Sequence, residues 1–200
     1  MRDQSSAFRH YIHFFNDLKS LYDQMDQRYD AVAGAYGFQC SGCRDNCCLT
    51  RFFHHTLIEF LYLRKGFADL DAKIQTELRL QASEVNEKVL QAEKNGNTPR
   101  IMCPLNVDGL CLLYAYRPMI CRLHGIPHEF RHPARGRIFG PGCHEFEASC
   151  GNHSYIEFNR TPFYQQMAQL ERGVRETSGI TDRFKKTVAQ MLADDLEKII

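Results

Sequence analysis

The nine cysteines of this 200-residue chain all lie between Cys40 and Cys150, and neither flank contains one. Four of them fall within the nine residues CSGCRDNCC that begin at Cys40. Cysteines that act only as small apolar core residues would be scattered along the chain. Since an odd number cannot pair completely in disulfides, a cluster of this kind in a reducing compartment indicates metal binding or catalysis. We therefore expect a fold built around thiolate-ligated metal.

Length and composition narrow the remaining possibilities. A chain of 200 residues can bury an adequate core as one domain, which we place at 1–200. The formal net charge of +1 argues against nucleic acid as a partner. No apolar run approaches the roughly 18 residues of a membrane-spanning helix, and the N-terminus does not resemble a secretory signal. We expect a cytoplasmic protein with no membrane partner.

Apolar spacing predicts helices at both ends of the chain. A three-and-four spacing of apolar residues indicates a long amphipathic helix in the flank 1–33. A second helix is predicted from about Cys47 to Gly66, and a third over 68–94, ending at the turn sequence NGNTP. The flank 161–200 reads as helical in two pieces, broken near TSGITD.

The middle of the chain has a different character. Residues 100–160 are rich in Gly, Pro, His and Arg, which predicts loops, brief helical turns and a small hairpin. So long a stretch with little regular structure is unusual inside a compact domain, and a bound metal would organise it. We therefore predict a mainly α fold, with helical flanks around an irregular, metal-organised cysteine-rich centre containing little β structure.

The first group of cysteines has the spacing of a metal knuckle followed by an adjacent pair. Two residues between Cys40 and Cys43 let a tight turn aim both thiols at one ion. Cys47 and Cys48 are predicted at the N-terminus of the second helix, capped by the Asp-Asn pair at 45–46. Neighbouring helical residues point about 100° apart. The pair therefore suits two metals or a polynuclear centre better than one tetrahedral ion, although one cysteine could be a ligand and the other packing.

The second group comes from CPLNVDGLCLLYAYRPMICRLHG and GPGCHEF. The Asp108-Gly109 turn can bring Cys103 and Cys111 together. The leftover cysteine is Cys150. The predicted metal ligands are thus Cys40, Cys43, Cys47, Cys48, Cys103, Cys111, Cys121 and Cys143.

These motifs, which cover residues 40–143, closely resemble the YkgJ-type cysteine-cluster family, described as zinc- or iron-chelating. The shared pattern is C-x2-C-x3-C-C, then Cys103-Pro104, Asp108-Gly109, Cys111, Tyr114, Arg117-Pro118, Cys121-Arg122 and a late Cys143. The flagellin lysine methylases look similar in their cysteine motifs. The resemblance implies metal binding, and it implies that such a centre can serve an enzyme.

Two cofactors suit this ligand set. Zinc favours closed tetrahedra of cysteines, and iron–sulfur clusters also take four cysteines. The adjacent pair favours an iron–sulfur cluster with a redox, electron-transfer or metalloenzyme role, because bridging sulfides space the irons. A zinc-stabilised interaction module and a metal-dependent modification enzyme are the alternatives. No catalytic residue and no particular partner is indicated, and nucleotide-binding and serine-hydrolase motifs are absent from the sequence.

Histidines and arginines provide further candidates. His124 and His144 could replace a cysteine ligand, and an iron site of His124, His128 and Glu129 is a further alternative. His54 and His55 lie seven residues beyond the cysteine pair, two helical turns away if the helix is continuous. Five arginines could offset thiolate charge, or could simply form a solvated face: Arg117, Arg122, Arg131, Arg135 and Arg137.

Overall fold

The computed structural model describes residues 8–40 and 47–196. In those residues it contains seven α-helices and two small two-stranded sheets, with 57% helix and 9% strand. The prediction of a mainly α fold with little β structure is therefore confirmed. No helix in this described part is both long enough and apolar enough to cross a bilayer.

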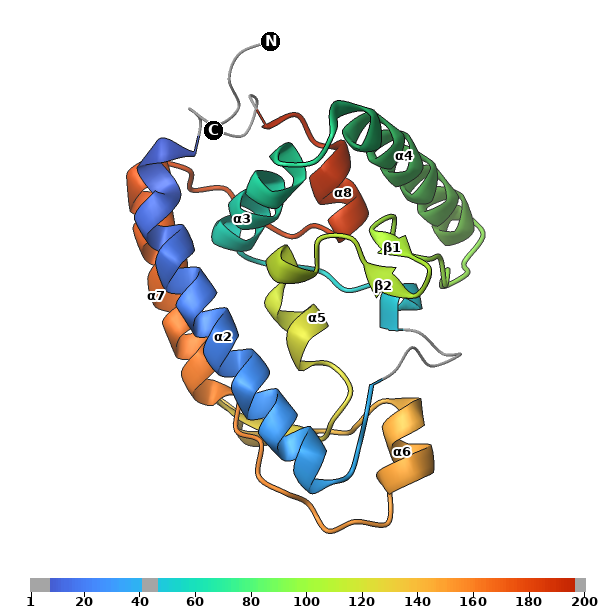
Figure 1. Ribbon diagram of the computed structural model, residues 1–200, viewed down its shortest axis with the longest axis vertical. Helices are drawn as coiled ribbons and strands as arrows, with labels where there is room; N and C mark the ends of the chain where they lie inside the picture. Colours follow the sequence, from blue (N-terminus) through green and yellow to red (C-terminus); the bar gives the residue numbers. More distant parts are fainter. Residues whose placement is uncertain (1–7, 41–46, 197–200) are drawn as a thin grey trace.

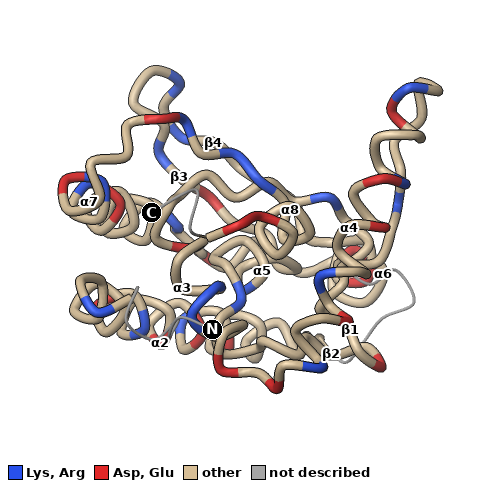
Figure 2. Tube along the Cα trace, turned by 90° about the horizontal axis from the view of Figure 1, so that it is seen from above, with Lys and Arg blue, Asp and Glu red and all other residues tan. Residues whose placement is uncertain are grey.

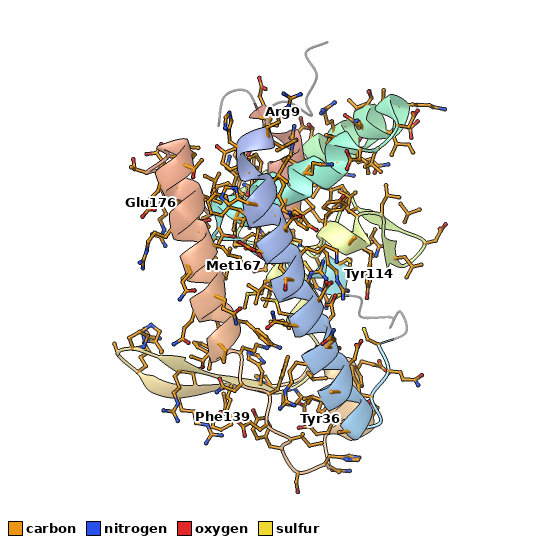
Figure 3. The ribbon with its side chains drawn as sticks, turned by 60° about the vertical axis from the view of Figure 1, so that its left-hand side comes forward. Arg9, Tyr36, Tyr114, Phe139, Met167 and Glu176 are labelled. Atoms are coloured by element: carbon orange, nitrogen blue, oxygen red, sulfur yellow. The ribbon has the colours of Figure 1, made fainter. Side chains whose placement is uncertain are left out.

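The two flanks of the chain pack against each other. The short 3-10 helix η1 (Arg9–Tyr11) leads into α2 (Ile12–Ala35). Helix α7 (Thr161–Ser178) lies alongside α2 and runs in the opposite direction (Figures 1 and 3). Gly173 permits this close approach, because a Cβ atom there would lie 2.6 Å from the ring of Phe14. Helices α2 and α7, one from each predicted helical flank, thus form one wall of the molecule.

The second helix begins later than the sequence predicted. The prediction of a helix from the adjacent cysteine pair is wrong, since Cys47–Leu49 forms only a 3-10 turn (η2). The chain then runs extended to Thr56, which caps α3 (Leu57–Ala68). The backbone of His54 pairs with that of Lys186 through two hydrogen bonds of 2.8 and 3.0 Å. This pairing uses the backbone groups that a helix would need. The predicted cap at 45–46 lies outside the described residues.

The third helix and the last one form the opposite side of the molecule. Helix α4 (Ala72–Lys94) starts four residues later than predicted, because the Asp71 side chain accepts a hydrogen bond from a first-turn N–H group and caps it there. It packs against α8 (Val188–Ala193). The chain breaks between α7 and α8 at Gly179, whose φ of 71° is left-handed. The two-piece C-terminal flank is confirmed.

The middle segment contains the short elements that its composition predicted. Two hairpins, a 3-10 turn and two short helices lie between α4 and α7 (Figure 1). They are β1 (Asn106–Val107) paired with β2 (Leu110–Cys111), η3 (Tyr114–Tyr116), α5 (Met119–Leu123), β3 (His128–His132) paired with β4 (Gly136–Gly140), and α6 (His144–Cys150).

Apolar anchors tie this middle segment into the core. Six of its apolar side chains are at most 3% exposed and belong to the same hydrophobic cluster as the helical flanks: Leu105, Leu113, Leu123, Ile126, Phe146 and Phe158. The expectation that a metal, in place of an apolar core, organises residues 100–160 is therefore incomplete. Buried apolar side chains fix the segment at intervals, and the loops and short elements between them carry the cysteines.

Candidate metal centre

Seven of the eight cysteines predicted as ligands line one cavity of about 560 Å³. They are Cys40, Cys47, Cys48, Cys103, Cys111, Cys121 and Cys143, and none of them is in a disulfide. The eighth, Cys43, lies outside the described residues. The seven span more than half of the sequence, so their meeting at one cavity is a product of the fold.

Two long-range backbone bonds gather these segments. The Cys103 N–H group donates to the Cys48 carbonyl at 2.9 Å, which joins the first cysteine motif to the second. The Cys143 N–H group donates to the Gly125 carbonyl at 2.8 Å. Gly125 has a φ of 124°, and a Cβ atom there would lie 2.6 Å from the Tyr29 hydroxyl. A glycine is therefore required where the chain passes α2 toward Cys143.

The predicted turn between Cys103 and Cys111 is present. Asp108 and Gly109 have φ angles of 50° and 86°, and they close the β1–β2 hairpin. Cys111 pairs with Asn106 in this hairpin, and the Asn106 N–H group donates to the Cys103 carbonyl at 3.0 Å. The turn therefore brings Cys111 back beside Cys103, and both cysteines line the cavity.

Backbone N–H groups donate to the sulfur atoms of three of these cysteines. The donor–acceptor pairs are Leu105 to Cys103, Leu113 to Cys111 and Phe146 to Cys143, the last at 3.4 Å. Each donor is itself one of the buried core anchors. Hydrogen bonds of this kind favour a thiolate over a thiol and tune the properties of metal–sulfur centres.

Burial opposes ionisation of the Cys103, Cys111 and Cys121 thiols. Burial raises the pKa of Cys103 to about 12, and it also raises the pKa of Cys111 and, strongly, that of Cys121. Without a cation these thiols keep their protons at neutral pH. A coordinated metal ion deprotonates a thiol outright, so the same burial that penalises free thiolates makes this group of sulfurs suited to a bound cation.

The adjacent cysteines differ from each other. A side-chain hydrogen bond between them raises the pKa of Cys47 and lowers the pKa of Cys48 to about 6. The nearby Asn106 side chain and the positive charge of Arg117 lower the pKa of Cys48 further. Cys48 therefore carries negative charge at neutral pH, as an initial metal ligand would.

Two of the five candidate arginines lie beside the thiols. Arg117 and Arg122 both line the cavity and lower the pKa of Cys111. Arg122 is 5% exposed, forms an ion pair with Asp26 of α2, and donates to the carbonyls of Ala115 (2.6 Å) and Arg117 (2.9 Å). It therefore combines charge compensation with a structural role in holding the turn before α5.

The other three arginines form a separate basic surface. Arg131, Arg135 and Arg137 are exposed on the β3–β4 hairpin and do not line the cavity. Figure 2 shows Lys and Arg positions along this hairpin. Arg137 pairs with Glu129, so this carboxylate is already engaged by a cation. The candidate site of His124, His128 and Glu129 gains no support from this arrangement.

A buried carboxylate that the sequence analysis overlooked positions the α5 segment. Glu59 is 6% exposed, and its Oε1 accepts a hydrogen bond of 2.8 Å from the Met119 N–H group at the start of α5. Its Oε2 accepts one of 2.5 Å from the Thr56 hydroxyl. Burial raises the pKa of Glu59. The signal in the sequence was a single carboxylate inside the apolar run 57–63.

The histidines divide between the cavity and the surface. His124 and His54 line the cavity, and the His124 ring lies 5.1 Å from that of Phe52. His144 is exposed at the start of α6 and does not line it. The helical spacing invoked for His54 and His55 is wrong, because both lie before α3 begins.

Cys150 is placed apart from the other described cysteines. It is 4% exposed, packs in the core, and its thiol donates to the Tyr36 carbonyl at 3.5 Å. It does not line the cavity. Cys150 therefore packs as a small apolar residue of the core.

The donor atoms surround a common space without converging on a point. Among the described residues, no three His, Cys, Asp or Glu side chains come together closely enough to hold an ion. The chemistry of the donor set nevertheless fits a thiolate-ligated metal, because seven cysteines that form no disulfide, N–H groups aimed at sulfur and two arginines share one cavity. Comparisons with protein families, curated proteins and solved structures find no match. The resemblance to the YkgJ-type family thus stays a prediction.

Proposed function

We propose that this chain is a metal-binding protein whose cysteines hold a polynuclear iron–sulfur centre with a redox role. The observation that carries the proposal is the convergence on one cavity of seven cysteines from distant segments, none of which is in a disulfide. The ligands would be drawn from these seven and Cys43. A bound iron–sulfur cluster supplies one-electron transfer over a wide range of potentials.

The residues around the cavity have separate tasks in this proposal. The N–H groups of Leu105, Leu113 and Phe146 stabilise negative charge on sulfur. Arg117 and Arg122 place positive charge beside the thiols. In iron–sulfur proteins, hydrogen bonds and net charge of this kind set the reduction potential.

The test is the composition of protein purified without oxygen. We expect brown protein that contains iron and acid-labile sulfide, with a visible absorption that bleaches on reduction. More than one metal ion per chain is expected, because eight cysteines exceed the four of a single site. Colourless protein that holds stoichiometric zinc and folds normally would contradict the iron–sulfur proposal and favour the zinc-stabilised interaction module.

Two matched substitutions assign the metal to this cavity. Cys111→Ser removes a sulfur that lines the cavity and should lower the metal content. Cys150→Ser changes a buried cysteine that does not line the cavity and should leave the metal content unchanged. Equal metal content in the two variants would mean that the cavity cysteines are not the ligands.

A further inference from the structure

The cavity extends beyond the thiols into a region with apolar walls. Side chains from α4, from the segment that leads to Cys103 and from the start of α8 line this region: Val85, Val89, Pro99, Ile101, Val188 and Ala189. None of these offers a metal donor. Small-molecule sites are typically cavities of about 300–1,000 Å³ with mostly apolar walls and a few placed polar groups. The whole cavity, at about 560 Å³, is of that size.

The His54 side chain enters this region from the stretch before α3. Arg51, Phe52 and His54 all line the cavity, and the Arg51 guanidinium group is already paired with Glu93. Phe53 is instead covered by two cations, with Arg51 at 4.8 Å and Lys185 at 4.4 Å from its ring centroid. The backbone pairing with residue 186 fixes the direction of the His54 side chain.

The imidazole of His54 has an unused hydrogen-bonding atom. His54 is 3% exposed, and its Nε2 is buried without a hydrogen-bond partner among the described residues. A buried polar atom in this state costs free energy unless a ligand or water pairs with it. Burial lowers the pKa of His54 to about 4, so the ring is neutral at neutral pH. A neutral ring selects a hydrogen-bonding group and not an anion.

We propose that the apolar part of the cavity is a binding site for an uncharged, mostly apolar small molecule whose hydroxyl group hydrogen-bonds to His54 Nε2. A hydroxyl group both donates and accepts, so it pairs with Nε2 in either tautomer of the ring. The proposal goes beyond metal binding and does not depend on it, because His54 and the six apolar residues are not predicted ligands.

A pair of probes that differ only in the hydroxyl group tests this site. The full chain, as purified, is titrated with 1-naphthol and with naphthalene, and binding is followed by the fluorescence anisotropy of each probe. We expect 1-naphthol to bind roughly fivefold more tightly, the effect of one net hydrogen bond. If neither probe binds, or if both bind equally, the proposal is overturned.

Variants then assign the preference to His54. His54→Phe keeps the apolar wall, so it should bind naphthalene as before and lose the roughly fivefold preference for 1-naphthol. The exposed neighbour provides the control: His55→Phe should retain the preference. Naphthalene binding also reports that the His54 variant is folded. A preference that survives in His54→Phe would overturn the proposal, whatever the metal content of the protein.

Discussion

Replacing Arg122 with alanine should destabilise this protein more than any other single change of a charged residue beside the cavity. The side chain is 4% exposed, and its guanidinium group has three hydrogen-bonding partners and lies 4.1 Å from the centroid of the Tyr22 ring. It donates to the carbonyls of Ala115 and Arg117 and forms an ion pair with Asp26. These bonds connect helix α2 to the turn that precedes Cys121.

The magnitude follows from the partners that the substitution leaves behind. Each of the two carbonyl bonds contributes about 1 kcal/mol net, and somewhat more because the donor is charged. The ion pair contributes less than a fully buried one, because the Asp26 side chain is 31% exposed and Arg117 also lies 3.5 Å from its other oxygen. We expect a loss of about 3 kcal/mol for Arg122→Ala, a large part of the total of about 5–15 kcal/mol for a typical domain.

Urea unfolding followed by circular dichroism measures this loss as a change in the free energy of unfolding. Arg122→Lys keeps the charge but not the fork of donors, and it should recover only the part of the loss that comes from Asp26. The control is Lys19→Ala, whose ion pair with Asp23 is exposed on both sides and contributes at most about 0.5 kcal/mol. An Arg122→Ala variant within about 0.5 kcal/mol of the wild-type protein would refute the reasoning.

Three further predictions follow from other parts of the molecule. Gly66→Ala should destabilise the protein by about 1–3 kcal/mol, because a Cβ atom would lie 2.3 Å from the Tyr116 ring. Gly34→Ala, with no neighbour within 4 Å of the added Cβ atom, should stabilise the protein by about 0.5–1 kcal/mol. Thermal melts compare the stabilities of the two variants. Burial lowers the pKa of His128 from 6.5 to about 4, so its contribution to stability is present above pH 6.5 and is lost as the pH falls toward 4. Because His128 is only half-buried, His128→Gln should remove about 1–2 kcal/mol of that acid sensitivity in denaturation curves measured between these pH values. Removal of metal by a chelator should lower the free energy of unfolding but leave most of the helical circular dichroism signal, because apolar anchors hold the middle segment. Complete loss of that signal would mean that the apolar anchors cannot keep the protein folded without metal.

The sequence predicted those parts of the fold that local pattern determines. The spacing of apolar residues identified α2, the NGNTP turn marked the end of α4, and Asp108-Gly109 identified the turn of the first hairpin. The start of α3 was wrong because a tertiary contact decided it: the backbone of His54 pairs with Lys186, a residue far along the chain. Helix periodicity and capping carry no information about such a partner.

The candidate site, like the fold, has parts that the sequence predicts and parts that depend on tertiary contacts. Spacing and resemblance singled out eight cysteines and set Cys150 apart. Seven of the eight line the cavity, and Cys150 does not. The gathering of those cysteines depends on the hydrogen bond between Cys103 and Cys48 and on the passage of Gly125 beside Tyr29, which no local pattern reveals. Glu59 was overlooked for a similar reason, since its role depends on Met119, 60 residues away.

The alternation of cysteines with core anchors explains how a middle segment with so little regular structure can present a defined site. Leu105, Leu113 and Leu123 each follow a cavity cysteine by two residues, and all three are at most 3% exposed. The leucine side chain fixes the backbone in the core, so the preceding cysteine can face the cavity. At two of these positions the leucine N–H group also donates to the sulfur. The same short unit therefore anchors the chain and lowers the pKa of the thiol against the larger effect of burial. A core of this kind stabilises the protein independently of metal, which leaves the sulfur atoms available for a centre with a chemical role.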